Sequence, residues 1–350
     1  MIVGSLWVIQ IVGCVRRIFC VLVSLLVCFL VMNHVVTALP QAGQPDAEDL
    51  LTQGKKHIAE GHFSEAVAAF NQYKQAAPND PRPYFFSGVA LAESGRLSAA
   101  AAELSEAVRL GPDQSEYILS HANVLVQLGH KSQAIKELSV FEKDEVANRL
   151  TTAGMWQLGE VYFRLEKAQD ALRILELLAK RDLKDPGIDL LRGKVYKLIG
   201  NFDLAQQSFE KSLESVSESS TPYNKAPAFF ELGKVLQQRN EIPVAKKAFL
   251  EALQLSPNNP EILHALGTVC LAMNEVDEAI QYLEKAEPVG ANFPQIYYAL
   301  GQAYQRKGDS VKGAKYLNLR KAQEINLAKR KKEILEHEEL TLITLGEEKL

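Results

Sequence analysis

The chain has 350 residues, of which 47% are hydrophobic and 23% charged, and its formal net charge at pH 7 is -4. This composition is that of a folded protein with a substantial core, and it excludes an intrinsically disordered chain. The small negative charge provides no basic field of the kind that nucleic-acid-binding proteins use, so we expect no nucleic-acid partner.

The chain begins with an apolar leader. Arg16 and Arg17 precede an uncharged run over residues 18–32, and small residues at Ala38 offer a candidate cleavage position. A basic pair, an apolar run and a small-residue site are typical of secretory signals. We therefore predict that residues 1–39 are a signal peptide.

A second interpretation of the leader is an uncleaved membrane anchor. If the apolar run is extended to Val36, it approaches the minimum length of a bilayer span. In both interpretations the basic pair favours the cytoplasmic side, so residues after the linker at 40–46 are expected outside the cytoplasm, in the periplasm or the extracellular space. The membrane is then a partner only through the N-terminal segment.

Cysteine usage limits the chemistry of the remaining chain. Cys14, Cys20 and Cys28 lie in the leader, which leaves Cys270 alone in the rest of the sequence. A disulfide framework and a cysteine-based zinc site are therefore excluded there. We expect Cys270 to be a small buried hydrophobe.

Three kinds of residue recur at regular spacing after the linker. A small residue recurs at intervals of 34, 34, 37, 34, 40, 34 and 34, as Gly54, Gly88, Ala122, Gly159, Gly193, Gly233, Gly267 and Gly301. Twelve residues after each comes a second small residue: Ala66, Ala100, Ala134, Ala171, Ala205, Ala245, Ala279 and Gly313. Four residues further on is a large apolar residue: Phe70, Leu104, Leu138, Leu175, Phe209, Phe249, Leu283 and Leu317.

This repeat resembles the tetratricopeptide repeat family, in which a 34-residue helix-turn-helix unit carries an L-G-x2-Y, A-x3-F and P pattern. Leu158-Gly159 with Tyr162, Leu300 with Tyr304, and the closing Pro257 carry the resemblance. It implies an all-α fold, a right-handed α-solenoid of about eight helix-turn-helix units with a C-terminal capping helix. The predicted domains after the linker are the repeat region, 47–327, divided at 47–80, 81–114, 115–148, 152–185, 186–219, 226–259, 260–293 and 294–327, and a terminal helix and tail, 328–350.

The same spacing predicts the positions of turns and insertions. Gly95, Gly129, Gly200 and Gly308 fall where the first helix of a unit ends, so we predict a left-handed cap at each. The two longer intervals place extra residues before Met155 and between Ser215 and Ala226. Each insertion is expected to lengthen a loop between units.

The sequence contains no H-E-x-x-H, G-x-x-x-x-G-K, G-x-S-x-G or G-x-G-x-x-G motif. Its histidines are scattered over different repeats and tails. We therefore expect no enzyme, no catalytic residues, no cofactor and no metal site.

Recognition of a protein segment is the remaining function. In the family, the first helix of each unit lines a concave groove, and its fifth residue commonly faces that groove. Here this position is apolar or aromatic in nearly every unit: Leu51, Phe85, Leu119, Trp156, Leu190, Phe230, His264 and Tyr298. Polar neighbours complete the predicted groove: Asn123, Glu160, Lys194, Lys234 and Gln302. The alternative is that the apolar residues only pack between neighbouring units.

The sequence thus predicts an exported bacterial interaction scaffold of the cell envelope that holds a protein or peptide segment in the groove. A membrane-anchored assembly factor that tethers a cell-envelope complex is the alternative.

Overall fold

The computed structural model describes residues 46–181, 185–214, 225–290 and 293–347. The predicted leader and most of the second insertion lie outside these residues. The chain divides into two compact units, Met1–Leu50 and Leu51–Leu350, and only residues 46–50 of the first belong to the described part. No helix among the described residues is both long enough and apolar enough to span a bilayer.

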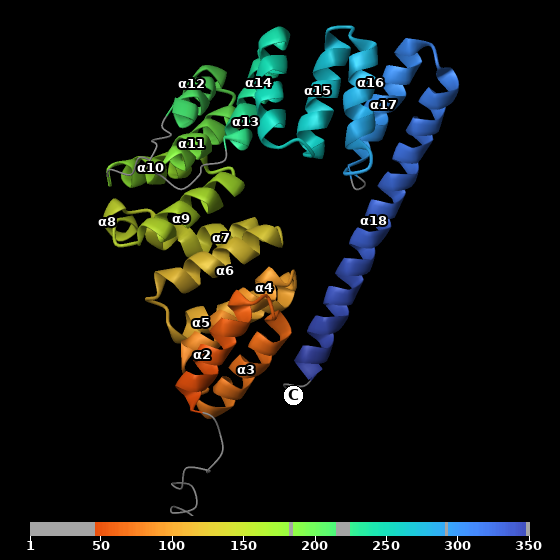
Figure 1. The fold of residues 1–350 in the computed structure, drawn as a ribbon. Coiled ribbons are helices and arrows are strands. Elements are labelled where there is room, and N and C mark those ends of the chain that lie inside the picture. The colour runs from red at the N-terminus through yellow and green to blue at the C-terminus, as the bar shows by residue number, and fades with distance from the viewer. Residues whose placement is uncertain (1–45, 182–184, 215–224, 291–292, 348–350) are drawn as a thin grey trace, which may run out of the picture. The chain divides into compact units, whose positions relative to one another are not determined.

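The described part of the chain contains 17 α-helices and one short 3₁₀-helix, η1, and no strand (Figure 1). Successive helices form first and second members of helix-turn-helix units, as predicted. In chain order they are α2 (Ala47–Ala59) and α3 (Phe63–Ala76), α4 (Pro81–Glu93) and α5 (Leu97–Leu110), α6 (Ser115–Gln127) and α7 (Lys131–Leu138), α9 (Thr152–Arg164) and α10 (Ala168–Ala179), α11 (Pro186–Leu198) and α12 (Phe202–Glu214), α13 (Ala226–Gln238) and α14 (Ile242–Leu255), α15 (Pro260–Ala272) and α16 (Val276–Ala286), α17 (Pro294–Lys307) and α18 (Ser310–Glu347).

The repeated small residues let the two helices of a unit approach closely. A Cβ atom added to Gly233 would lie only 2.6 Å from Cε1 of Phe249, and one added to Gly267 would lie 2.5 Å from Cγ of Leu283. The large residue sixteen positions after each glycine therefore occupies the space that a side chain would need. Ala245, the second small residue of the Gly233 unit, is fully buried. These contacts confirm the packing role predicted for the repeated positions.

The turn within each unit needs one residue in the left-handed conformation. The four glycines predicted there have φ between 75° and 89°. Three units place a larger residue in the same conformation, with φ of 61° at Glu166, 64° at Asn240 and 63° at Asn274. The glycine prediction is confirmed, and the turn geometry persists in units that lack the glycine.

The first insertion lengthens the connection between units, as predicted, but the connection is partly helical. Residues 139–151 join α7 to α9, whereas residues 111–114 join α5 to α6, and the longer connection contains η1 (Ser139–Phe141) and α8 (Asp144–Ala147). Phe141 and Ala147 are buried, so the added segment contributes to the core. Arg173 of α10 holds it by donating to the Asp144 carboxylate at 2.7 Å and to the Phe141 carbonyl at 3.0 Å. The helical structure and the burial of this segment were not predicted.

The last unit and the terminal helix are also joined differently. The prediction separated them at residue 328, whereas α18 runs without a break from Ser310 to Glu347. Tyr316 stacks on Tyr304 of α17 with ring centroids 5.6 Å apart, while Ile325 is 68% exposed. The contact with the last unit is therefore made by the first turns of α18.

Candidate partner-binding surface

The fifth residues of the first helices differ strongly in exposure. We call these residues the anchor row. Leu51, Phe85 and Leu119 are 5%, 4% and 1% exposed, whereas Tyr298 is 42% exposed. The remaining members are partly exposed: Trp156, Leu190, Phe230 and His264. Only the part of the row from Trp156 onward therefore presents a surface to a ligand.

The buried members are covered by the next unit. The ring of Tyr117 lies against Phe85 with centroids 4.7 Å apart. Leu119 faces the backbone of α9, because a Cβ atom on Gly154 would lie 3.6 Å from Cδ1 of Leu119. Phe85 and Leu119 thus pack between units, as the alternative interpretation described, and they are not accessible to a partner in this structure.

A pocket of about 250 Å³ opens beside Phe230, in the exposed part of the row. It is lined by residues of three successive units. These are Lys194 of α11; Ala226, Pro227, Phe230 and Glu231 of α13; and Ser256, Asn259, Glu261 and Ile262 at and before the start of α15. The pocket therefore joins two predicted site residues, Lys194 and Phe230, to a neighbouring unit.

The charged groups around this pocket differ in whether they have ion-pair partners among the described residues. Lys197 forms an ion pair with Glu231, and Lys234 Nζ lies 3.6 Å from the other oxygen of that carboxylate. Burial lowers the pKa of Lys197, although the Glu231 carboxylate opposes this effect. Lys234 also lies over the Phe230 ring, 5.2 Å from its centroid. Lys194 makes no ion pair with any described residue, so its ammonium remains available to an anion.

The other predicted polar residues lie on either side of the pocket. Glu160 is exposed, and Asn123 accepts a hydrogen bond from Arg164 at 2.9 Å. Gln302 donates to the hydroxyl of Tyr298 at 2.9 Å, and the guanidinium of Arg320 lies 4.7 Å from the Tyr298 ring centroid. These contacts hold the side chains in place without covering Tyr298.

His264 is held in an apolar environment. Its ring meets that of Phe293 edge to face, with centroids 5.0 Å apart. Burial lowers the pKa of His264, so the ring is neutral at pH 7 and serves as an aromatic surface. No cation is expected from this member of the row.

Ser256, Asn259 and Ile262 were missed as candidate site residues. Ser256 follows α14, Asn259 precedes α15 and Ile262 lies in the first turn of α15, whereas the prediction considered only the fifth residue of each first helix and its polar neighbours. Asn259 also caps α15, accepting from the backbone N–H of Glu261 at 2.9 Å. The signal that could have located them is the repeat period, which brings the start of the next first helix beside Phe230.

A second pocket, of about 620 Å³, lies on α5, α6 and α7. His121 and Glu137 are among its polar lining residues, with Nδ1 of the buried imidazole 2.9 Å from Oε1 of the carboxylate. This pocket was not predicted, because its lining comes from three helices whose contacts the repeat spacing does not specify. The contact joins two helices of one unit, but the second carboxylate oxygen of Glu137, Oε2, has no hydrogen-bond partner among the described residues.

Cys270 is buried, as predicted. Burial raises the pKa of its thiol to about 12, and the nearby Glu278 carboxylate adds to the effect. The thiol is therefore neutral at physiological pH, which does not suit a nucleophile.

Models of the tetratricopeptide repeat match residues 47–115, 190–215 and 236–303. The TPR repeat-containing thioredoxin TTL4 of Arabidopsis thaliana is 30% identical over 99 residues, which are 28% of this chain and 14% of that protein. The chain thus matches about one seventh of that relative's length.

Two solved structures are similar in fold. One is a tetratricopeptide repeat protein from Parabacteroides merdae, with a TM-score of 0.58, 16% identity and coverage of 73% of this chain and 98% of that one. The other is the APC/C hetero-tetramer Cut9-Hcn1, with a TM-score of 0.54, 19% identity and coverage of 74% of this chain and 49% of that one. At these identities the similarity concerns the fold alone.

Proposed function

Because the chain is built from tetratricopeptide repeats, which generally form protein-interaction scaffolds, we propose that it binds a segment of a protein partner along the exposed part of the anchor row. The observation that carries this proposal is the open pocket beside Phe230, with Lys194, which has no ion-pair partner among the described residues, in its wall. The segment binds across first helices of successive units, where Trp156 and Tyr298 extend the apolar surface on either side of Phe230.

The size of the pocket favours a side chain of a peptide over a small molecule. Small-molecule sites usually measure about 300–1,000 Å³, and this pocket of about 250 Å³ is below that range. A large apolar side chain of the partner would bury its surface against Phe230 and Pro227, which both line the pocket and are accessible. Such aromatic and aliphatic contacts supply most of the affinity in protein interfaces.

The charges indicate what flanks that side chain. Glu231 is already paired with two lysines, whereas Lys194 is unpaired among the described residues. A carboxylate near the apolar side chain would pair with Lys194, and the partly desolvated wall of the pocket strengthens such a pair. We therefore propose an extended segment with one large apolar residue and a nearby carboxylate.

Affinity capture with residues 47–350 tests the proposal, followed by direct binding measurements with the captured protein. The Phe230→Ala and Lys194→Ala variants should each weaken binding by at least about tenfold, the effect of an important interface residue. Val244→Ala is the matched control, because Val244 is 48% exposed on a second helix, α14. If Val244→Ala weakens binding as much as Lys194→Ala, the pocket is not the binding site.

Stability must be measured on the same variants, because Phe230 also packs 5.8 Å from the ring of Phe249. Lys194→Ala removes no core contact and should leave the urea midpoint unchanged. Loss of binding in Lys194→Ala at unchanged stability supports the proposal, whereas full binding by this variant contradicts it.

We also propose that the scaffold works outside the cytoplasm, which rests on the leader at residues 1–39. Cleavage would release it into the periplasm or the medium, and the alternative is an anchored assembly factor of a cell-envelope complex. Fractionation with an antibody to the repeats separates these two: a cleaved protein is recovered without detergent, whereas an anchored one requires it. Recovery in the cytoplasm would contradict both.

We do not extend thioredoxin activity to this chain. A dithiol exchange site needs two neighbouring cysteines, and Cys270 is the only cysteine in the described residues. Its burial and raised pKa also oppose thiolate chemistry. The similarity to the thioredoxin relative therefore supports a repeat scaffold.

A further inference from the structure

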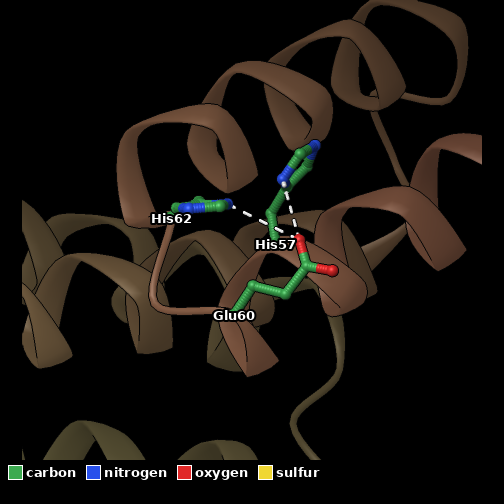
Figure 2. Close-up of side chains that lie close together, drawn as sticks. All are labelled: His57, Glu60 and His62. Carbon is green, nitrogen blue, oxygen red and sulfur yellow. Dashed lines mark ion pairs between the residues drawn. The ribbon is translucent and has the colours of Figure 1, made fainter.

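Three side chains capable of binding a metal converge at the turn between α2 and α3 (Figure 2). His57 belongs to the last turn of α2, Glu60 follows that helix, and His62 is the residue before α3. Gly61, between the last two, has a φ of 78°. This left-handed residue reverses the chain, so that His62 returns toward the end of α2.

The donor atoms are spaced as ligands of one ion would be. Oε2 of Glu60 lies 4.0 Å from Nδ1 of His57 and 3.5 Å from Nδ1 of His62, and all three donors lie within 4.8 Å of one another. Ligand atoms at about 2.0–2.1 Å from a tetrahedral zinc ion are about 3.4 Å apart. Figure 2 shows both imidazoles directed at the same carboxylate. Small side-chain rotations would therefore complete the set.

One donor lacks a partner in the absence of an ion. Nδ1 of His57 is buried and accepts or donates no hydrogen bond. An unsatisfied buried nitrogen is unfavourable, and a metal bond would satisfy it. The side chains of His57, Glu60 and His62 are 25%, 43% and 58% exposed, so an ion can enter from solvent and keep a water in a fourth position.

The surrounding charges leave this cluster accessible to a cation. The nearest cationic group with a described contact is Lys56, whose ammonium lies 3.8 Å from the other oxygen of Glu60 and whose side chain is 73% exposed. An exposed pair of this kind is weak and leaves Oε2 facing the imidazoles.

A second group of possible ligands, Cys270, Glu275 and Glu278, differs in this respect. Lys246 lies 2.7 Å from one of its carboxylates and 2.8 Å from the other, so its ammonium already neutralises them. The carboxylates and Lys246 then form a structural ion-pair network, and we assign no metal there.

We propose that His57, Glu60 and His62 bind one divalent transition-metal ion of the Zn²⁺ type. Two imidazole nitrogens and one carboxylate suit zinc and neighbouring transition metals, whereas Mg²⁺ prefers sites made of oxygen alone. The ion would link the end of α2 to the start of α3 across Gly61, which stiffens the turn of the first unit. The site lies at a turn and is independent of the anchor row.

Calorimetric titration of the full-length chain with ZnCl₂ tests this site, with MgCl₂ as the comparison. The wild type should bind one Zn²⁺, and this binding should be lost or weakened at least about tenfold in each of His57→Ala, Glu60→Gln and His62→Ala, since even the loss of a residue that only hydrogen-bonds to a ligand costs that much. His130→Ala is the matched control, because His130 also precedes a second helix, α7, and belongs to no ligand group of the described residues. Zn²⁺ should raise the melting temperature of the wild type and of His130→Ala, but not that of the three ligand variants.

The difference between variants excludes binding elsewhere on the full chain. If zinc binding and the thermal shift persist unchanged in any of the three ligand variants, or if His130→Ala loses them, the assignment is wrong. The absence of zinc binding by the wild type, or equal binding of Mg²⁺, would also overturn it.

Discussion

Adding a single methyl group at Gly233 should destabilise the protein, whereas the same change at Gly159 should stabilise it. In the Gly233→Ala variant the new Cβ would lie 2.6, 2.7 and 3.0 Å from three ring atoms of Phe249. That ring is fully buried and cannot move aside. Overpacking of this kind costs about 1–3 kcal/mol. The gain in helix propensity from glycine to alanine, about 1 kcal/mol, offsets only part of it.

Gly159 has room for the methyl group. Its nearest neighbours would be Ile174 and Leu175 at 3.7 Å, an ordinary van der Waals distance. The propensity gain of about 1 kcal/mol should therefore appear in full in Gly159→Ala. The two variants, which make the same chemical change at the same repeat position, are expected to differ by about 1–3 kcal/mol in free energy of unfolding.

Urea unfolding followed by far-UV circular dichroism measures this difference. A second substitution, Phe249→Leu, should restore part of the stability lost in Gly233→Ala, because the third unit pairs Ala122 with Leu138 and buries both. Equal free energies of unfolding for Gly233→Ala and Gly159→Ala, or a Gly233→Ala variant that is the more stable of the two, would contradict the overpacking.

Three further predictions concern a cap, a turn and the second small position. Burial alone would raise the pKa of Asp80, but hydrogen bonds, chiefly from Arg82, lower it to about 2. The carboxylate therefore stabilises the fold above about pH 4, and this contribution is lost as the pH falls toward 2. Asp80→Asn should therefore lower the free energy of unfolding by about 1–2 kcal/mol at neutral pH, and by little at about pH 2, when urea midpoints are compared. Glu166→Gly should raise the melting temperature, because relief of the left-handed backbone strain at this residue is worth about 1–2 kcal/mol. This gain exceeds the stabilisation lost with the exposed ion pair between Glu166 and Lys131. A lower melting temperature would contradict this comparison. Ala245→Leu should lower the free energy of unfolding by about 1–3 kcal/mol, because Ala245 is fully buried between helices, and an unchanged urea midpoint would show that the helices can separate without cost.

The helix pairs and their contacts could be predicted because their causes are local and repeated. A glycine and a large residue sixteen positions later, as in Gly267 and Leu283, specify how one pair packs wherever they occur. The third unit departs from this rule because Phe141 and Ala147 can be buried by ending α7 early. Arg173 of the next unit binds this added segment. The repeat period does not predict a contact of this kind.

The histidine cluster was missed for a different reason. His57 and His62 were regarded as scattered, because no metal-binding motif has their spacing. The left-handed Gly61 brings His62 back beside the end of α2, and the short H-x-x-E-x-H segment then becomes a set of neighbouring donors. The available signal was the position of these residues on both sides of a predicted turn, which spacing along a straight helix does not reveal.

Exposure along the anchor row is decided by what the following unit places over each residue. Tyr117 covers Phe85, and Phe293 meets His264 edge to face. Tyr298 lies in α17, which α18 follows in the described part of the chain, and Arg320 of α18 is its only described ring contact. The repeat phase therefore identifies the positions that can face a partner, but what the next unit places over each of them determines which of them do: a ring over Phe85 and helix backbone over Leu119. This asymmetry is the physical reason for locating the proposed binding site near Phe230 and not along the whole row.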